Sequence, residues 1–238
     1  MKTPLNIPLH YELAINFLRP NEKDILCDIG GGDGVLWRII TLYQSTNLPM
    51  YVLIDIDQKA LRRAKYASRS THTHIICGSA TALPLRKGVI TKVTCLEMIE
   101  HLSLNNVNIA LNEAHRVLKN RGVLVLSTPH YSSSFLINLL DYGWLAGHKH
   151  FKVAEVKALL SKAGFKVLNL KIFGGLLSYL GGYWIIFWLF ILKRLVGNKI
   201  TPLYYSVMPL ENLVLRISRI DAYKLGKRGR QLIVKAVT

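Results

Sequence analysis

A glycine-rich loop is the part of this sequence whose residue types and spacing most clearly favour chemistry. It reads Asp28-Ile29-Gly30-Gly31-Gly32-Asp33-Gly34. Its glycines remove side chains where the backbone must turn sharply and lie against a ligand. A pyrophosphate would bind at the start of the following helix, but Asp28 and Asp33 would repel it. The local charge therefore favours a cationic ligand.

An acidic residue at the end of the next predicted strand suits a sugar. Asp55 follows the apolar run 52–54, and a carboxylate can accept hydrogen bonds from both hydroxyls of a ribose diol. A single glycine-rich turn is often only a structural loop. Strand, loop, helix, strand and acid in this order are more specific, and they predict an adenosyl ligand.

Residues 24–172 resemble the class I S-adenosylmethionine-dependent methyltransferases, in the broad type 11 group that includes ubiquinone and menaquinone biosynthesis methyltransferases. The glycine loop is similar to the first motif of that family, and Asp55 is similar to its ribose-binding acid. The resemblance implies S-adenosylmethionine as the cofactor. The cofactor-binding residues that the resemblance implies are Asp28, Gly30, Gly31, Gly32, Gly34, Asp55, Ile56, Ser79, Ala80 and Glu97.

Two further segments carry the resemblance. Residues 78–85 are similar to the segment that follows the third strand of the family and holds the adenine, and residues 95–102 look like its fourth-strand motif. The family commonly has an acidic residue where Ser79 stands. We therefore expect a weaker contact to the adenine amino group, or one from the backbone of Ala80. The resemblance is specific for the cofactor and almost silent on the methyl acceptor.

Methyl transfer requires a general base only if the acceptor is a hydroxyl, a phenol or a protonated amine. Candidate side chains near the expected carboxyl ends of the strands are His101, His130, Tyr131, His148 and His150. Each of these residue types is more often structural or solvated than catalytic. We assign the catalytic role to His130, which directly follows the fifth predicted strand, and to His101.

The pattern Glu97-x-x-Glu100-His101 allows a second interpretation of the segment that contains His101. Two carboxylates and an imidazole at this spacing could converge on a divalent cation, with His148 or His150 as a fourth ligand. The pattern resembles the metal-holding cluster of some quinone O-methyltransferases and of small-RNA 3′-end 2′-O-methyltransferases. Many relatives without a metal look the same here, with the acidic residues orienting the cofactor and capping the helix. We therefore predict no metal.

A framework of alternating strands and helices must position these residues. Apolar runs predict strands at 24–29, 50–54, 74–77, 92–96, 123–127, 165–172 and 231–237. Helical periodicity predicts helices at 8–18, 34–43, 58–68, 105–118 and 153–163. The alternation predicts an α/β protein with a Rossmann-like, doubly wound, seven-stranded sheet, and ligands outside the carboxyl ends of its strands.

The pattern changes after residue 172. Residues 174–192 contain no charged residue, and six of these 19 positions are aromatic. Because residues 231–237 look like a last strand beside 165–172, both ends of the segment between them lie on one side, which excludes a single membrane crossing. We expect a core at 1–172, a hydrophobic helical insertion at 173–227 that lies in a membrane interface, and a returning strand at 228–238. A lid, a dimer contact and a true span are the alternatives.

The chain is both basic and apolar. Its 238 residues include 31 Lys plus Arg against 14 Asp plus Glu, a net charge of +17, and half of them are hydrophobic. This composition excludes a disordered chain. A membrane tolerates both properties, because anionic headgroups attract the charge and acyl chains take the apolar part. Residues 193–238 alone carry ten basic and two acidic residues, so we expect an anionic membrane surface as a partner, and nucleic acid less.

The expected function is S-adenosylmethionine-dependent methylation of a hydrophobic, membrane-associated acceptor, such as an isoprenoid quinone, a polyprenoid or a lipid. The net charge favours an RNA methyltransferase as the alternative, although the basic residues are scattered and no RNA-binding module is recognisable. In a small-molecule O- or N-methyltransferase the insertion would be only a lid or a dimer contact. A cofactor-binding membrane adaptor would do no chemistry.

The cysteines and the N-terminus indicate the compartment. Cys27, Cys77 and Cys95 show no metal-ligand or disulfide spacing, which predicts buried, reduced thiols in an intracellular protein. Residues 1–10 contain no apolar stretch of the kind found in signal peptides. We therefore expect a cytoplasmic protein that associates with a membrane peripherally or monotopically.

Overall fold

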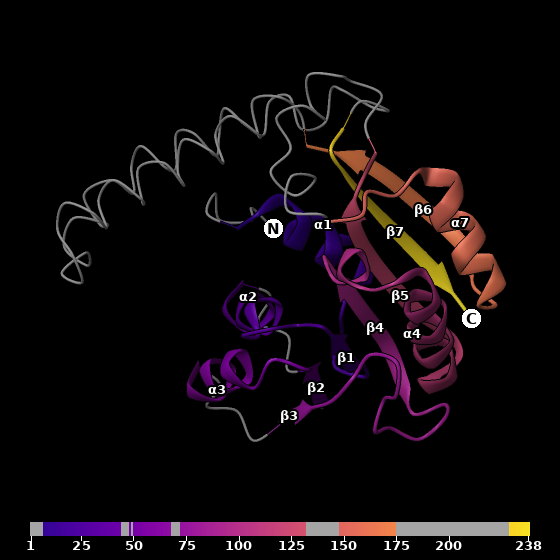
Figure 1. Cartoon of the computed structure of the whole chain (residues 1–238). Helices are drawn as coiled ribbons and strands as arrows, with labels where there is room; N and C mark the ends of the chain where they lie inside the picture. Colours follow the sequence, from indigo (N-terminus) through magenta and orange to yellow (C-terminus); the bar gives the residue numbers. More distant parts are fainter. Residues whose placement is uncertain (1–6, 44–47, 49, 68–71, 132–147, 175–228) are drawn as a thin grey trace, which may run out of the picture.

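Figure 1 shows the computed structural model of the protein, which describes residues 7–43, 48, 50–67, 72–131, 148–174 and 229–238. The strands are β1 Ile25–Ile29, β2 Met50–Asp55, β3 Thr73–Cys77, β4 Ile90–Leu96, β5 Leu118–Pro129, β6 Lys166–Phe173 and β7 Gln231–Val237. The helices are α1 Leu9–Leu18, α2 Val35–Tyr43, α3 Gln58–Ala67, α4 Leu104–Val117 and α7 Val153–Lys162, and a short 3-10 helix covers Ile99–His101.

The strands form one seven-stranded sheet in the order β3-β2-β1-β4-β5-β7-β6. Strand β7 is antiparallel to both of its neighbours, and the other paired strands are parallel. The chain extends the sheet first from β1 towards β3 and then from β4 towards β6, so the strand order reverses between β1 and β4. Ligands of doubly wound sheets bind at this position. The predicted fold class is confirmed, whereas the predicted helical insertion lies outside the described residues.

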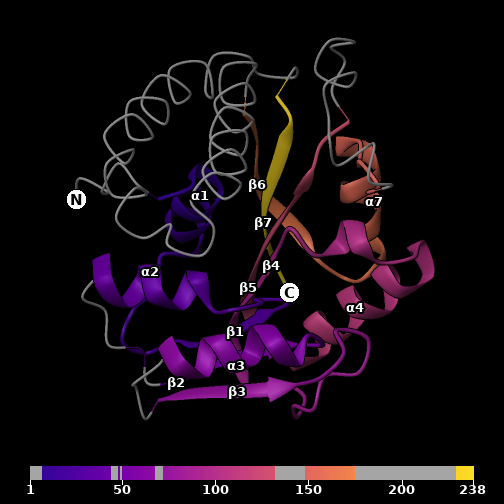
Figure 2. The ribbon, with the colours of Figure 1, turned by 60° about the vertical axis from the view of Figure 1, so that its left-hand side comes forward.

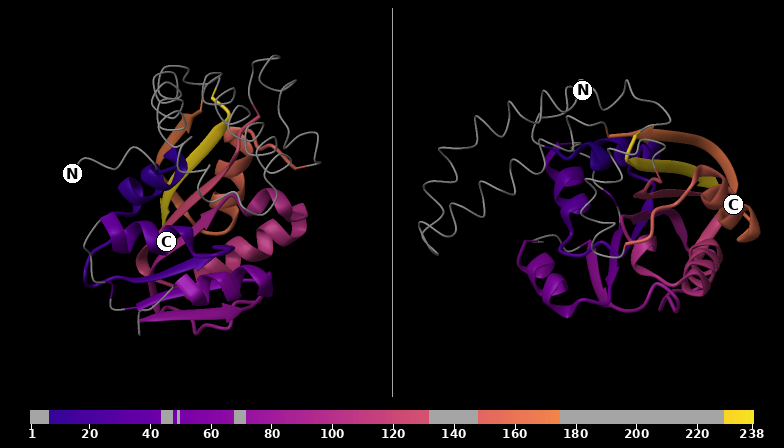
Figure 3. Two further views of the ribbon diagram at one scale, coloured as in Figure 1. Left: turned by 90° about the vertical axis from the view of Figure 1, so that its left-hand side faces the viewer. Right: turned by 45° about the horizontal axis from the view of Figure 1, so that its top comes forward.

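Helices cover both faces of the sheet, with α1, α2 and α3 on one face and α4 and α7 on the other (Figures 2 and 3). Alternate strand residues separate into two cores: Cys27 and Val93 pack in the core below α4 and α7, whereas Leu26 and Tyr51 pack in the core below α1 to α3. A strand buried on both faces needs a nearly continuous apolar run. This is why the short apolar runs could be recognised as strands.

Some boundaries differ from those predicted. Leu118 was expected to end a helix, but α4 ends at Val117 and Leu118 begins β5, where it pairs with Ile90. Its side chain is buried, so its apolar character fits either element, and the pairing with β4 decides. The prediction that all cysteines are buried is wrong for Cys77, which is exposed at the end of the edge strand β3.

The two strands that flank the predicted insertion lie side by side. Strand β7 lies beside β6, as predicted, and its other neighbour is β5. The backbone N–H of Arg230 donates to the carbonyl oxygen of Gly174 at 2.8 Å. The segment between these residues therefore leaves and returns at the same end of the sheet. Among the described residues, no helix has the length and apolar character needed to cross a membrane.

Candidate cofactor and acceptor site

The glycine loop has the backbone shape that its composition predicts. Gly30, Gly32 and Gly34 have φ angles of 72°, 56° and 76°, in the left-handed region that side chains other than that of glycine rarely adopt. A Cβ atom on Gly30 would also clash with the side chain of Met98, whereas no atom lies within 4 Å of the Cβ position of Gly32. The loop therefore packs tightly on its inner side and is open around Gly32.

Asp28 lies beneath this loop. Its buried carboxylate accepts hydrogen bonds from the Tyr51 hydroxyl at 2.6 Å and the Thr94 hydroxyl at 2.7 Å. Burial raises the pKa of the Asp28 carboxyl, and these two hydrogen bonds oppose the rise. A Cβ atom on Gly31 would clash with this carboxylate. Asp28 therefore supports the loop from below.

Asp55 connects the loop to the end of β2. Its Oδ2 atom accepts a hydrogen bond from the N–H of Gly32 at 2.8 Å, and its Oδ1 atom accepts one from the N–H of Asp57 at 2.8 Å. Each carboxylate oxygen has two lone pairs, so both oxygens can still accept from a diol. The adjacent side chain of Ile56 is 77% exposed and offers an apolar surface beside this carboxylate.

A cavity of about 340 Å³ opens at the carboxyl ends of β1, β2 and β4. Its lining residues are Gly30, Ile54, Asp55, Ile56, Gly78, Ser79, Ala80, Glu97, Met98, His101 and Leu102. Six of the predicted cofactor-binding residues meet here: Gly30, Asp55, Ile56, Ser79, Ala80 and Glu97. Asp28, Gly31, Gly32 and Gly34 belong to the adjoining loop and are not among the lining residues.

Ser79 has a structural task in the wall of this cavity. Its hydroxyl lies 2.7 Å from that of Thr81 and accepts a hydrogen bond from the Thr81 N–H at 3.2 Å. These contacts close the turn that follows β3. Ala80 lies in the same wall, and a contact from its backbone to the adenine amino group stays a prediction.

Glu97 marks the boundary between the cofactor cavity and the neighbouring strands. It has a φ angle of 50°, and its Oε1 atom accepts a hydrogen bond from the Ser127 hydroxyl at 2.7 Å. The Oε2 atom accepts one from the side-chain amide of Gln231 at 3.2 Å. Burial raises the pKa of the Glu97 carboxyl. Sequence reasoning missed Gln231, whose only signal was its place at the start of the predicted last strand.

Glu100 is buried next to Glu97, and the Thr128 hydroxyl donates to its Oε2 atom at 3.1 Å. Burial and the neighbouring Glu97 raise the pKa of the Glu100 carboxyl to about 8, so it is mostly protonated at neutral pH. No three His, Cys, Asp or Glu side chains within the described ranges are grouped so that they could hold a metal ion. The predicted absence of a metal stays a prediction.

Among the five candidate bases, only His101 is a lining residue of the cavity. The ring of His148 meets it edge-on, with the ring centroids 4.5 Å apart. Burial, and secondarily His148, lower the pKa of the His101 imidazole. His101 is therefore neutral at neutral pH, which is the form that accepts a proton.

His130 lies at the end of β5 and contacts the start of the last strand. Its buried ring places Nδ1 2.8 Å from the carbonyl oxygen of Gly229, and its backbone N–H donates to the carbonyl of Arg230 at 2.6 Å. Because a carbonyl only accepts, Nδ1 carries the hydrogen in this contact. Burial lowers the pKa of the ring. His130 is not a lining residue of the cavity, unlike His101.

Comparison with known proteins finds similarity in the part of the chain that holds the glycine loop and Asp55. Residues 27–126 match the family described as Methyltransferase domain. An uncharacterized protein of Methanocaldococcus jannaschii is 31% identical over 107 residues, which cover 44% of this chain and 41% of that protein. The match therefore spans less than half the length of this relative.

Solved structures share the fold. An S-adenosylmethionine-dependent methyltransferase from Mesorhizobium loti aligns with a TM-score of 0.62 at 16% identity, covering 99% of this chain and all of that one. The geranyl diphosphate C-methyltransferase of Streptomyces coelicolor aligns with a TM-score of 0.63 at 13% identity, covering 96% and 79%. The family match over residues 27–126 supports a methyltransferase domain with S-adenosylmethionine as its cofactor, and the solved structures share its fold.

The residues of the cavity suit this cofactor. The open space around Gly32 leaves room for a ligand against the backbone, Asp55 can accept from the ribose hydroxyls, and Ile56 offers an apolar surface to an adenine. Lysine and arginine are absent from the described lining residues, which suits a positively charged sulfonium.

Proposed function

We propose that this protein transfers the methyl group of S-adenosylmethionine to a hydrophobic, membrane-associated acceptor, such as an isoprenoid quinone, a polyprenoid or a lipid. The observation that carries the proposal is the position of the two ends of the longer segment 174–230, which contains the uncharged, aromatic-rich residues 174–192. Gly174 and Arg230 are hydrogen-bonded to each other at the end of the sheet where the cofactor cavity opens. The chain therefore leaves the sheet after Gly174 and rejoins it at Arg230 at the end where the cavity opens.

Direct contacts join this position to the cofactor cavity. Gln231, the first residue of β7, donates to Glu97, which lines the cavity. Gly229 and Arg230 contact His130 at the end of β5. An apolar segment that starts after Gly174 and ends before Arg230 would give a membrane-dissolved acceptor a path with little water to the methyl group.

Charge supports a membrane surface. Residues 193–238 carry a net charge of +8, and they follow the uncharged segment directly. Positive side chains beside an apolar, Trp- and Tyr-rich segment are typical of proteins that bind anionic membrane interfaces. The geranyl diphosphate methyltransferase among the structural neighbours supports the proposal only by analogy, because a shared fold hosts many functions.

For the chemistry, we assign His101 as the proton acceptor when the acceptor is a hydroxyl or a phenol. The bound cofactor supplies an electrophilic methyl group on a sulfonium. The chain must align the acceptor with that group and exclude water. His101 lines the cavity in its neutral form, and His148 contacts its ring. His130, which is bonded to Gly229, fixes the base of the insertion and acts as a positioning residue.

The acceptor class can be tested by label transfer. Purified protein is incubated with S-adenosylmethionine labelled in the methyl group and, separately, with lipid and RNA extracts of the source cells. We expect label in the organic-solvent fraction of the lipid extract, and none with the Asp55→Ala variant. Label in RNA alone would replace the proposal with the RNA methyltransferase alternative, which the net charge of +17 favours.

Membrane association needs its own measurement. The variant Trp184→Ser/Trp188→Ser changes two aromatic residues of the uncharged segment, and Tyr66→Ser is the matched control because Tyr66 is 91% exposed on α3. We expect the parent and the control to float with phosphatidylglycerol vesicles and the tryptophan variant to float much less. Equal flotation of both variants would contradict a membrane role for the segment.

A further inference from the structure

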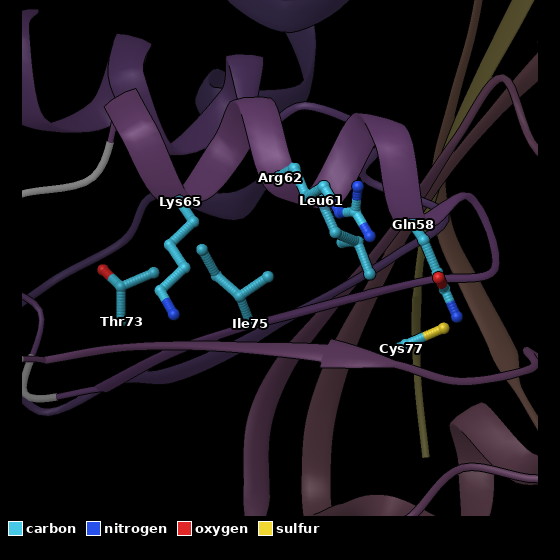
Figure 4. Close-up of a pocket in the computed structure, with 7 residues that line it drawn as sticks. All are labelled: Gln58, Leu61, Arg62, Lys65, Thr73, Ile75 and Cys77. Carbon is cyan, nitrogen blue, oxygen red and sulfur yellow. The ribbon is translucent and has the colours of Figure 1, made fainter.

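A second cavity lies at the outer edge of the sheet, between α3 and β3, and has a volume of about 480 Å³. Figure 4 shows its seven lining side chains facing each other from the two elements. Gln58, Leu61, Arg62 and Lys65 come from α3, and Thr73, Ile75 and Cys77 come from β3. The helical positions are three or four residues apart and the strand positions alternate, so each element contributes one face.

The groove exists because the sheet ends here. Strand β3 pairs only with β2 in the described part of the chain, and α3 packs across its face. No further strand fills the space below the helix among the described residues. The volume falls within the range of about 300–1,000 Å³ that is typical of sites for small molecules.

The charge of the groove is one-sided. Helix α3 carries Lys59, Arg62, Arg63 and Lys65 and no acidic residue, and the lining residues include no carboxylate. Arg62 and Lys65 make no hydrogen bond or ion pair with the described residues. By contrast, the described ion pairs satisfy other cations, as in Lys92 with Asp24 at 2.6 Å. Two cations without a carboxylate partner in a groove favour an anionic ligand.

The apolar lining residues indicate that the ligand also has an apolar part. Leu61 of α3 and Ile75 of β3 face each other in the groove (Figure 4). Both belong to or pack against the apolar core. A ligand that filled the groove would therefore bury apolar surface as well as pair its charge. A fully hydrated inorganic ion would leave this apolar wall unused.

We propose that the groove between α3 and β3 binds a small amphipathic anion, whose carboxylate or phosphate pairs with Arg62 and Lys65 and whose apolar body lies between Leu61 and Ile75. This site is separate from the methyl-transfer site and does not depend on the proposed function. Cys77 provides a built-in reporter of its occupancy. Its thiol lies exposed in the groove, whereas Cys27 and Cys95 are buried.

The test measures how fast iodoacetamide alkylates Cys77, by peptide mass spectrometry, in full-length protein without S-adenosylmethionine. The probe is octyl phosphate below its micellar concentration, with uncharged octyl glucoside as the chain-matched control. We expect octyl phosphate to slow the alkylation of Cys77 several-fold and octyl glucoside to have little effect. In Arg62→Gln/Lys65→Gln the half-protecting concentration should rise about tenfold or more, as expected for lost charged hydrogen bonds.

The variant Lys59→Gln/Arg63→Gln is the matched control, because it removes the same charge from the same helix at positions outside the lining. It should keep the parent's response to octyl phosphate. An equal loss in both variants, equal protection by octyl glucoside, or no protection by octyl phosphate would overturn the proposal. Protection by phosphatidylglycerol vesicles as well would identify a lipid headgroup as the source of the anion, and protection by soluble octyl phosphate alone would identify a free small molecule.

Discussion

The cofactor half and the acceptor half of the site are built in different ways. The cofactor half consists mainly of backbone: glycines with positive φ angles and N–H groups that Asp55 holds in place. The half that we propose for the acceptor contains titratable side chains, with Glu97, Glu100 and His101 close together after β4. Backbone geometry hardly responds to pH, whereas buried acids and imidazoles do. We therefore expect steric substitutions to impair the cofactor half, and changes of charge to impair the acceptor half.

The largest effect should come from the acceptor half. His101→Gln should lower kcat with a hydroxyl acceptor by about 10²–10⁴-fold, the usual range for removal of a general base, with the dissociation constant for S-adenosylmethionine nearly unchanged. In the parent, kcat/KM should rise with pH to a plateau, with a midpoint below 6.5 because the pKa of His101 is lowered. Steady-state kinetics measure kcat and kcat/KM, and calorimetric titration measures the dissociation constant for S-adenosylmethionine. A His74→Gln control on exposed β3 surface should behave like the parent.

A steric change in the cofactor half should come next. Gly30→Ala combines a positive φ angle with a clash against Met98, and we expect it to lower the free energy of unfolding by about 2–5 kcal/mol. Gly88→Ala is the control, because Gly88 has a similar φ of 68° and no atom within 4 Å of the Cβ position. It should cost only about 1–2 kcal/mol. Equal losses in urea unfolding would show that tight packing of the loop is unimportant.

Substitution of Asp55 should change the affinity for the cofactor. Asp55→Ala removes the acceptor for the Gly32 N–H and for the ribose, and S-adenosylmethionine should bind about 10- to 100-fold more weakly. Asp57→Asn is the control, since asparagine can still accept from the Lys59 N–H at the start of α3. Calorimetric titration should show parental affinity for that control. An Asp55→Ala protein that binds as tightly as the parent would contradict the assignment of this carboxylate.

The smallest effect is a slope of stability with pH. The pKa of Glu100 is raised from 4.5 to about 8, so the folded state holds a proton that the unfolded state releases. The stabilisation is full below pH 4.5 and is lost as the pH rises through 8, at up to about 1.4 kcal/mol per pH unit. The free energy of unfolding of Glu100→Gln, measured with urea, should therefore fall less than that of the parent between pH 5 and 8.5. The exposed control Glu22→Gln should keep the parental slope.

The cofactor half was largely predictable because short segments encode it. Gly30, Asp55 and Ala80 belong to local motifs, and each lies at the carboxyl end of a strand or within three residues of it. Once the strands are parallel neighbours, their carboxyl ends must meet. The placement of these residues around one cavity therefore follows from the alternation of elements, without knowledge of any side-chain contact.

The acceptor half was less predictable because its contacts connect distant residues. The bond between Gln231 and Glu97 joins positions 134 residues apart, and that between Ser127 and Glu97 joins positions 30 apart. His101 and His130 looked equivalent in the sequence, since each follows a strand. Packing distinguishes them: His101 lines the cavity, and the ring of His130 is bonded to the backbone of Gly229.

The sequence by itself determined the α/β fold, the glycine loop, the position of Asp55 at the end of the second strand and the presence of the last strand beside β6, because hydrophobic periodicity and glycine act locally. Only the tertiary structure decided which carboxyls are buried, which histidine lines the cavity and where a basic groove opens beside the edge strand. Desolvation and hydrogen bonding depend on what surrounds a group from every side. That surrounding is set by strands brought together from distant parts of the chain, and no local pattern contains it.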